Sequence, residues 1–73
     1  MEKEKLIIET GYLAAQWCGQ ILPLSVLESS SGYYIGTVDE GLPCTRESAE
    51  YWGQEKDALN ALTSKKWTQR REP

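Results

Sequence analysis

The strongest pattern of apolar and polar positions lies in the middle of the chain, between Tyr33 and Val38. Aromatic and β-branched residues dominate this run, which is the composition of a β-strand. Alternate residues of a strand face opposite sides of a sheet. One predicted set is Tyr33, Ile35 and Thr37, and the other is Tyr34, Gly36 and Val38. Gly36 inside the run indicates a bulge or a neighbour packed close to the backbone.

Turn-forming residues separate this run from a weaker strand pattern on each side. Residues 24–28 alternate loosely, and the SSSG cluster at 29–32 predicts the first turn. Residues 39–43 predict the second turn, and residues 45–52 predict a third strand. In that strand Thr45, Glu47, Ala49 and Tyr51 would form a small or apolar face, opposite Arg46, Ser48, Glu50 and Trp52. Such a three-stranded antiparallel sheet is expected to be covered on one side only.

Helical spacing occurs before and after the predicted strands. Residues 11–18 predict a short helix, with Thr10 as N-cap and Gly19 just after its end, although a strand remains the alternative. Its apolar face would contain Leu13, Ala14, Trp17 and Cys18. The apolar run at residues 5–8 is consistent with either a brief strand or the approach to this helix.

The last predicted helix spans residues 54–64, with Gly53 as N-cap and acidic residues in its first turn. Its apolar stripe consists of Ala58, Ala61 and Leu62, with Leu59 beside them. Trp67 is expected to pack against the core, and the following TQRREP segment to fray into solvent. The sequence therefore predicts one α+β domain, with an ordered core at about residues 5–68 and the C-terminal helix packed on one face of the sheet.

Charge is distributed unevenly along the 73 residues, whose net charge is −3. Residues 1–57 contain ten acidic and four basic residues, a balance of −6, whereas residues 65–73 have a balance of +3. An acidic body favours ordinary solubility or a partner with a basic surface, and it disfavours general binding of nucleic acid. The charged N-terminus and the lack of a long apolar stretch predict a cytoplasmic protein with no membrane contact.

The residue types needed for common enzyme chemistry are scarce. The chain has no histidine, and Cys18 falls at the end of a predicted helix, where the helix dipole disfavours a thiolate. Cys18 and Cys44 are therefore interpreted as small buried side chains, with a disulfide or half a metal site as the alternatives. The carboxylates do not follow a calcium-loop pattern, and no phosphate-binding GK[ST] motif follows the glycines. We expect no enzymatic activity, no catalytic residue, no cofactor and no metal.

The run GYYIGTVDEGLPCTRESAEYW, a helix with paired alanines and the closing WTQR resemble a family of small uncharacterised proteins from bacterial, phage or mobile-element genomes. Its pattern is a YYIGT strand, an acidic turn, a TRES or SRES strand, a tyrosine–aromatic pair and a helix that ends at tryptophan. The resemblance covers residues 32–70 and implies a β-β-α order. It implies no activity and no catalytic residue.

Aromatic residues in the predicted sheet exceed what one short helix can cover. An amphipathic aromatic residue among acidic ones is typical of an interface anchor. We therefore predict a non-enzymatic interaction module that binds a basic protein surface or a second copy of itself. The predicted contact residues are Tyr34, Asp39, Glu40, Glu47, Glu50 and Trp52.

A second hypothesis comes from the basic end of the chain. There, basic residues flank an aromatic residue, as in some weak contacts with nucleic acid. The residues concerned are Lys65, Lys66, Arg70 and Arg71. Binding of nucleic acid is the less favoured alternative, because the acidic residues of the predicted strands would repel phosphate.

Overall fold

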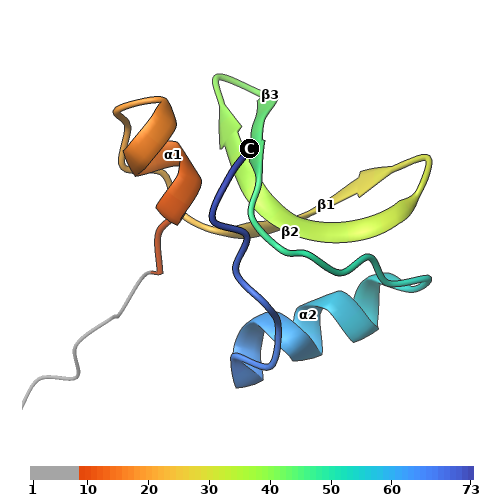
Figure 1. Ribbon diagram of the computed structural model, residues 1–73. Helices are drawn as coiled ribbons and strands as arrows, with labels where there is room; N and C mark the ends of the chain where they lie inside the picture. The colour runs from red at the N-terminus through yellow and green to blue at the C-terminus, as the bar shows by residue number, and fades with distance from the viewer. Residues whose placement is uncertain (1–8) are drawn as a thin grey trace, which may run out of the picture.

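A computed structural model describes residues 9–73 as two short helices and one sheet (Figure 1). The elements follow in the order α1 (Tyr12–Trp17), β1 (Ser25–Ser29), β2 (Gly32–Asp39), β3 (Leu42–Arg46) and α2 (Glu55–Ser64). The sheet is antiparallel, with strand order β1-β2-β3. This arrangement confirms the predicted α+β class. The apolar run at residues 5–8 lies outside the described residues.

The central strand β2 forms the middle of the core. Residues 34–37 are buried, and Ile35 and Thr37 have no exposed surface. Gly36 pairs with Ser25 on one side and Arg46 on the other, and the register to β3 shifts after Thr37. A Cβ atom at Gly36 would collide with the carbonyl oxygen of Thr45. The prediction of a close neighbour at Gly36 is confirmed, and the bulge lies just beyond it, between Thr37 and Val38.

β3 ends at Arg46, so the prediction of a regular strand to Trp52 is wrong. The N–H groups of Glu47 and Ser48 both donate to the carbonyl of Ile35, at 2.8 and 3.0 Å, which breaks the regular ladder. The chain rejoins β2 only where Trp52 and Tyr33 exchange two hydrogen bonds of 2.8 Å. The two alternating faces predicted for residues 45–52 therefore do not form beyond Arg46.

α1 lies beside β3 and buries only its first turn. Leu13 and Ala14 are fully buried, whereas Trp17 is 59% exposed and Cys18 is also exposed. The predicted four-residue apolar face is thus wrong for its second half, because Trp17 and Cys18 at the end of the six-residue helix stay exposed. The N-cap is Gly11 and not Thr10, and the chain leaves the helix through Gly19, as predicted.

α2 lies against β1 and the part of β2 that pairs with it (Figure 1). Ala58 and Ala61 are buried and Leu62 is half-buried, which confirms the predicted stripe, while Leu59 is exposed. The N-cap is Gln54, one residue later than predicted. Small side chains at the contact allow the helix backbone to approach the sheet closely.

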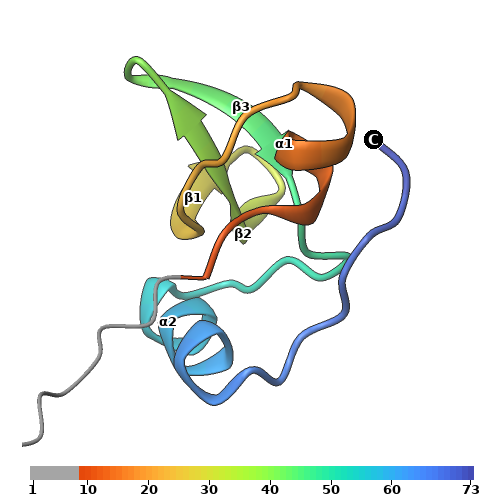
Figure 2. The same cartoon turned by 90° about the vertical axis from the view of Figure 1, so that its left-hand side faces the viewer.

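The C-terminal segment connects the two ends of the molecule. It runs from the end of α2 towards α1 (Figure 2). Thr68 accepts a hydrogen bond from the N–H of Ala49 at 2.9 Å, and the N–H of Arg70 donates to Glu47 at 2.8 Å. The prediction that this segment frays is therefore wrong for residues 68–70, because they pair with the irregular chain after β3.

Candidate interaction surface

Two of the six predicted contact residues lie inside the molecule. Glu47 is fully buried, and only 8% of Tyr34 is exposed. The ring of Tyr34 packs edge-on against Tyr51, with centroids 5.9 Å apart, and the guanidinium of Arg46 lies over Tyr51. Neither Tyr34 nor Glu47 is accessible to a partner, which corrects their assignment to the contact surface.

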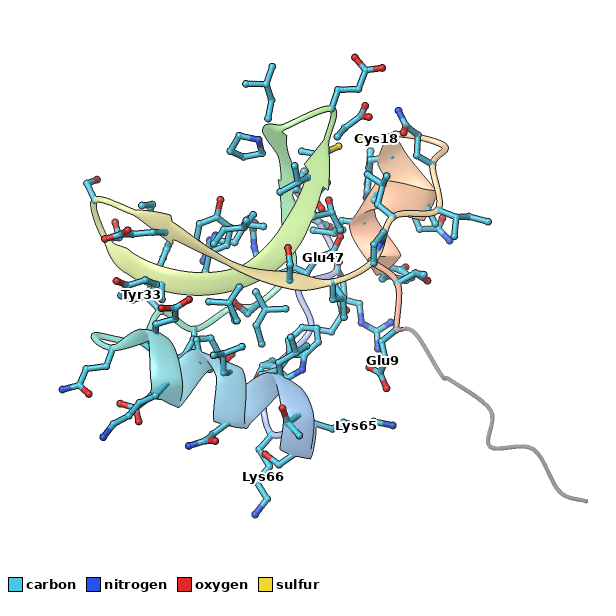
Figure 3. All side chains as sticks on the ribbon, turned by 180° about the vertical axis from the view of Figure 1, so that it is seen from behind. Glu9, Cys18, Tyr33, Glu47, Lys65 and Lys66 are labelled. Carbon is cyan, nitrogen blue, oxygen red and sulfur yellow. The ribbon has the colours of Figure 1, made fainter. Side chains whose placement is uncertain are left out.

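Glu47 instead anchors three separate parts of the chain (Figure 3). Its carboxylate accepts hydrogen bonds from the N–H groups of Leu13 and Ala14 in α1, at 2.9 and 3.1 Å. The hydroxyl of Thr45 donates to it at 2.6 Å, and the side-chain amide of Gln69 donates at 2.7 Å. The carboxylate therefore joins α1, β3 and the C-terminal segment.

The carboxylate of Glu47 takes the place of a side-chain cap at the start of α1. The N-cap residue Gly11 has no side chain to accept the free N–H groups, and a Cβ atom there would collide with the Glu47 carboxylate. Burial raises the pKa of Glu47, but the hydrogen bonds from Leu13, Thr45, Gln69 and Ala14 outweigh it and hold the pKa below its usual value. Glu47 is thus kept ionised by its structural partners.

The neighbouring predicted residues Glu50 and Trp52 are half-buried. Both oxygens of Glu50 accept hydrogen bonds from the N–H of Thr68, at 3.0 and 3.1 Å. The backbone of Trp52 pairs with Tyr33. The carboxylate of Glu50 and the backbone of Trp52 therefore already have partners within the fold.

Asp39 and Glu40, the remaining predicted residues, lie at the tip of the β2–β3 hairpin. Glu40 is exposed, and with Gly41 it forms a turn with φ values of 54° and 82°. Two positive φ angles in a two-residue hairpin loop favour asparagine, aspartate or glycine. A carboxylate of Asp39 accepts a hydrogen bond from the side-chain amide of Gln20 at 3.1 Å, which ties the hairpin tip to the loop after α1.

The most exposed large apolar side chains occur at this same end of the molecule. They are Ile21 at 81%, Leu42 at 69% and Trp17 at 59%. Sequence reasoning missed them, because helical spacing assigned Trp17 to the core and the predicted second turn contained Leu42, while Ile21 fell in no predicted element. The signal available was the short helix before Pro23, which has too few turns to bury both of its ends. We name Trp17, Ile21, Asp39, Glu40 and Leu42 the α1–hairpin surface.

The other exposed aromatic residues differ because arginine covers one side of each. Arg71 lies over the ring of Tyr12 at 5.4 Å, and Arg46 lies over that of Tyr51 at 4.6 Å. Cation–π contacts of this kind stabilise the ring and reduce the surface left for a partner. Trp17 has no contact of this kind among the described residues.

The basic residues of the alternative hypothesis are spread over several contacts. Lys65 forms an ion pair with Glu9 at 2.8 Å, and Arg70 donates to the carbonyl of Arg46 at 2.9 Å. Arg71 stacks on Tyr12, and Lys66 projects from the end of α2 (Figure 3). The structure thus engages three of the four residues within the fold, which weakens the case for a basic surface that binds phosphate.

The two thiols lie together at the α1–hairpin end. The Sγ atoms of Cys18 and Cys44 are 3.4 Å apart, and both residues are free cysteines. Cys18 is exposed, so the expectation that both thiols are buried is wrong. Cys18 is the C-cap residue of α1, at the exposed end of the helix.

Two structural observations and a comparison with known proteins bear on the site. Within residues 9–73 no cluster of three or more His, Cys, Asp or Glu side chains has the geometry to hold a metal ion. No helix in the described part of the chain has the length and apolar character needed to cross a membrane. Comparison with protein-family models, curated proteins and solved structures finds no match.

Proposed function

We propose that this protein is a non-enzymatic protein–protein interaction module that binds a basic protein through its α1–hairpin surface. The supporting observation is the exposure of Trp17, Ile21 and Leu42 at one end of a domain of 73 residues. Tryptophan is enriched among the residues that dominate binding energy in protein interfaces. An apolar centre with a charged rim is also the usual composition of such interfaces.

The acidic hairpin tip supports a basic partner. Asp39 and Glu40 lie beside the apolar residues of the surface, in a body with a balance of −6 over residues 1–57. Glu40 has a φ of 54°, a conformation that costs about 1 kcal/mol for a residue with a side chain. Glutamate is a less favoured residue in such a turn than asparagine, aspartate or glycine, which supports a role for its side chain.

The partner is more readily another protein than a second copy. Two copies that met through the α1–hairpin surface would bring Asp39 and Glu40 of each close to those of the other, and like charges repel. The resemblance of residues 32–70 to small proteins of bacterial and mobile-element genomes favours a host or defence protein as the target. The acidic charge supports an inhibitor of such a protein as the specific function proposed.

The test compares capture of a partner by matched variants. Immobilised protein is incubated with an extract of bacterial host cells, and captured proteins are identified by mass spectrometry. The variant Trp17→Ala/Ile21→Ala/Leu42→Ala should lose the specific partner, because all three side chains are exposed and their removal leaves the core intact. The control Leu59→Ala changes an exposed leucine on α2 and should retain it.

The captured protein is then purified and its affinity is measured by titration calorimetry. We expect the triple variant to bind the captured protein at least about tenfold more weakly than the wild type does. The affinity of the wild type should fall as the salt concentration rises. Equal affinity of the triple variant and the Leu59→Ala control for the captured protein would contradict the proposed surface. A wild-type dimer in sedimentation, or a salt-sensitive shift of a nucleic-acid probe without protein capture, would replace it with one of the two alternatives.

A further inference from the structure

The Cys18–Cys44 pair is a chemical feature that the proposed function does not use. Cys18 is the C-cap of α1, and Cys44 is the third residue of β3. They are 26 residues apart in sequence, yet their Sγ atoms approach to 3.4 Å. A disulfide needs these atoms at about 2.05 Å, so a movement of about 1.4 Å joins them. The fold brings two reactive groups to one point of the surface.

We propose that Cys18 and Cys44 form a redox-active dithiol site, which low-molecular-weight disulfides of the glutathione class convert to an intramolecular disulfide. The support is geometric: the sulfur atoms are adjacent, both thiols are free, and Cys18 is open to solvent. The pair also has no third or fourth ligand of the His, Cys, Asp or Glu type among the described residues. A closed structural zinc site needs four such ligands, so exchange chemistry suits the pair better.

The exchange proceeds in two steps that balance. The thiolate of Cys18 attacks one sulfur of oxidised glutathione, a protein–glutathione mixed disulfide forms, and one glutathione thiolate leaves. The thiolate of Cys44 then attacks Sγ of Cys18, the Cys18–Cys44 bond forms, and the second glutathione leaves. The two protons of the cysteine thiols end on the two glutathione molecules. The protein loses two electrons, and oxidised glutathione gains them.

The surroundings make the first step slow and the second fast. The hydrogen bond with Cys44, local loss of contact with water and the negative charges of Cys44, Asp39 and Glu47 raise the pKa of the Cys18 thiol. Little thiolate is therefore present near neutral pH. Once the mixed disulfide exists, Cys44 is already at its side, so closure of the ring precedes attack by a second glutathione.

The disulfide would fasten the free end of α1. The helix is anchored at its first turn by Glu47, while its last residues are exposed. A bond from Cys18 to Cys44 attaches that end to the β2–β3 hairpin. This inference does not depend on the proposed function, since it concerns the protein alone and needs no partner.

The test equilibrates the whole protein with defined ratios of reduced and oxidised glutathione, both folded and in urea. The products are trapped with acid and counted by mass spectrometry and maleimide labelling. We expect a monomer that has lost two hydrogen atoms and takes up no maleimide. The effective concentration of the thiol pair should be at least about 30-fold higher in the folded protein than in urea, because folding has already closed the loop.

Two variants distinguish ring closure from simple modification. Cys18→Ser and Cys44→Ser should each stop at the mixed glutathione disulfide, and circular dichroism establishes that they remain folded. The proposal is overturned if the wild-type protein carries two glutathione adducts, if it forms disulfide-linked dimers instead, or if folded and unfolded chains have equal effective concentrations. The wild-type comparison decides the matter even if a variant fails to fold.

Discussion

α1 and α2 are attached to the same sheet by different kinds of interaction. α2 buries the small apolar side chains Ala58 and Ala61 against β1 and β2. α1 buries Leu13 and Ala14, but its N–H groups also depend on the carboxylate of Glu47, which lies more than 30 residues away in sequence. α2 is held by apolar side chains that recur along the helix, and α1 is held largely by hydrogen bonds to the carboxylate of Glu47. The attachments of α1 and α2 to the sheet should therefore respond differently to mutation and to pH.

The largest expected effect follows from Glu47→Gln. The substitution keeps the shape of the side chain, but it removes the charge and places an amide donor among groups that all donate. We expect a loss of about 3 kcal/mol in the free energy of unfolding, measured by urea titration with tryptophan fluorescence. Amide exchange should show that α1 loses protection before α2 does.

The matched control for this anchor is Glu40→Gln, at the exposed hairpin tip. It removes the same charge without a buried partner and should change stability little. If the two variants have equal stability, or if α1 and α2 lose protection together, the contrast between the two ends is wrong.

The apolar packing of α2 on the sheet is tested by Ala58→Leu. Ala58 has no exposed surface, so three extra carbon atoms would push α2 away from the sheet. We expect a loss of about 2 kcal/mol, with protection lost first in α2. Ala58→Gly would not serve here, because glycine also lowers helix propensity. The nearby substitution Leu59→Ala, at a position that is 45% exposed, is the control and should cost much less.

Acid should weaken the attachment of α1 more than that of α2. The pKa of Glu47 is below its usual value of 4.5 in the folded protein, so the unfolded chain binds a proton more readily. Its contribution to stability is complete above pH 4.5 and declines as pH falls through the folded pKa. The pKa of Glu50 is lowered in the same sense by the hydrogen bonds from Thr68, which outweigh burial.

The measurement is the urea midpoint at a series of pH values from about 6 down to about 3. Glu47→Gln should show a flatter dependence than the wild type, and Glu50→Gln a smaller reduction in slope. A Glu47→Gln curve parallel to that of the wild type would mean that the carboxylate does not bind α1 in its ionised form.

The same contrast explains which features could be predicted from the sequence. The strand over residues 33–38 and the Ala58–Ala61–Leu62 stripe depend on neighbours in the chain, so periodicity was sufficient to predict them. Glu47 was instead assigned to an exposed acidic sheet. The available signal was its alternation with Thr45, which does not identify a partner. The missing cap at Gly11 could not be seen, because Thr10 was predicted as the N-cap.

The candidate surface was predicted only in part, for a related reason. The Asp39–Glu40 turn was found from local turn chemistry, which depends on adjacent residues. Trp17 was placed in the core because helical spacing does not show where a helix stops contacting the sheet. The approach of Cys18 to Cys44 depends on how α1 lies beside β3, and no local pattern encodes that.

The smallest expected effects concern the two residues other than glycine that have a positive φ within residues 9–73, one near each helix. Glu40 has a φ of 54° beside the α1 end, and Lys65 has a φ of 61° at the C-cap of α2. Asparagine adopts this conformation more easily than either residue. Glu40→Asn should therefore stabilise the protein by about 0.5 to 1 kcal/mol. Lys65→Asn should gain less, because it also removes the ion pair with Glu9.

Thermal unfolding at low and high salt separates the two contributions. The difference between Glu40→Asn and Lys65→Asn should narrow at high salt, because screening removes the ion pair from the wild type as well. A greater gain for Lys65→Asn at low salt would contradict this ranking. If Glu40→Asn also weakens binding of the captured partner, the same substitution that relaxes the turn removes a functional charge, which would explain why glutamate occupies a position suited to asparagine.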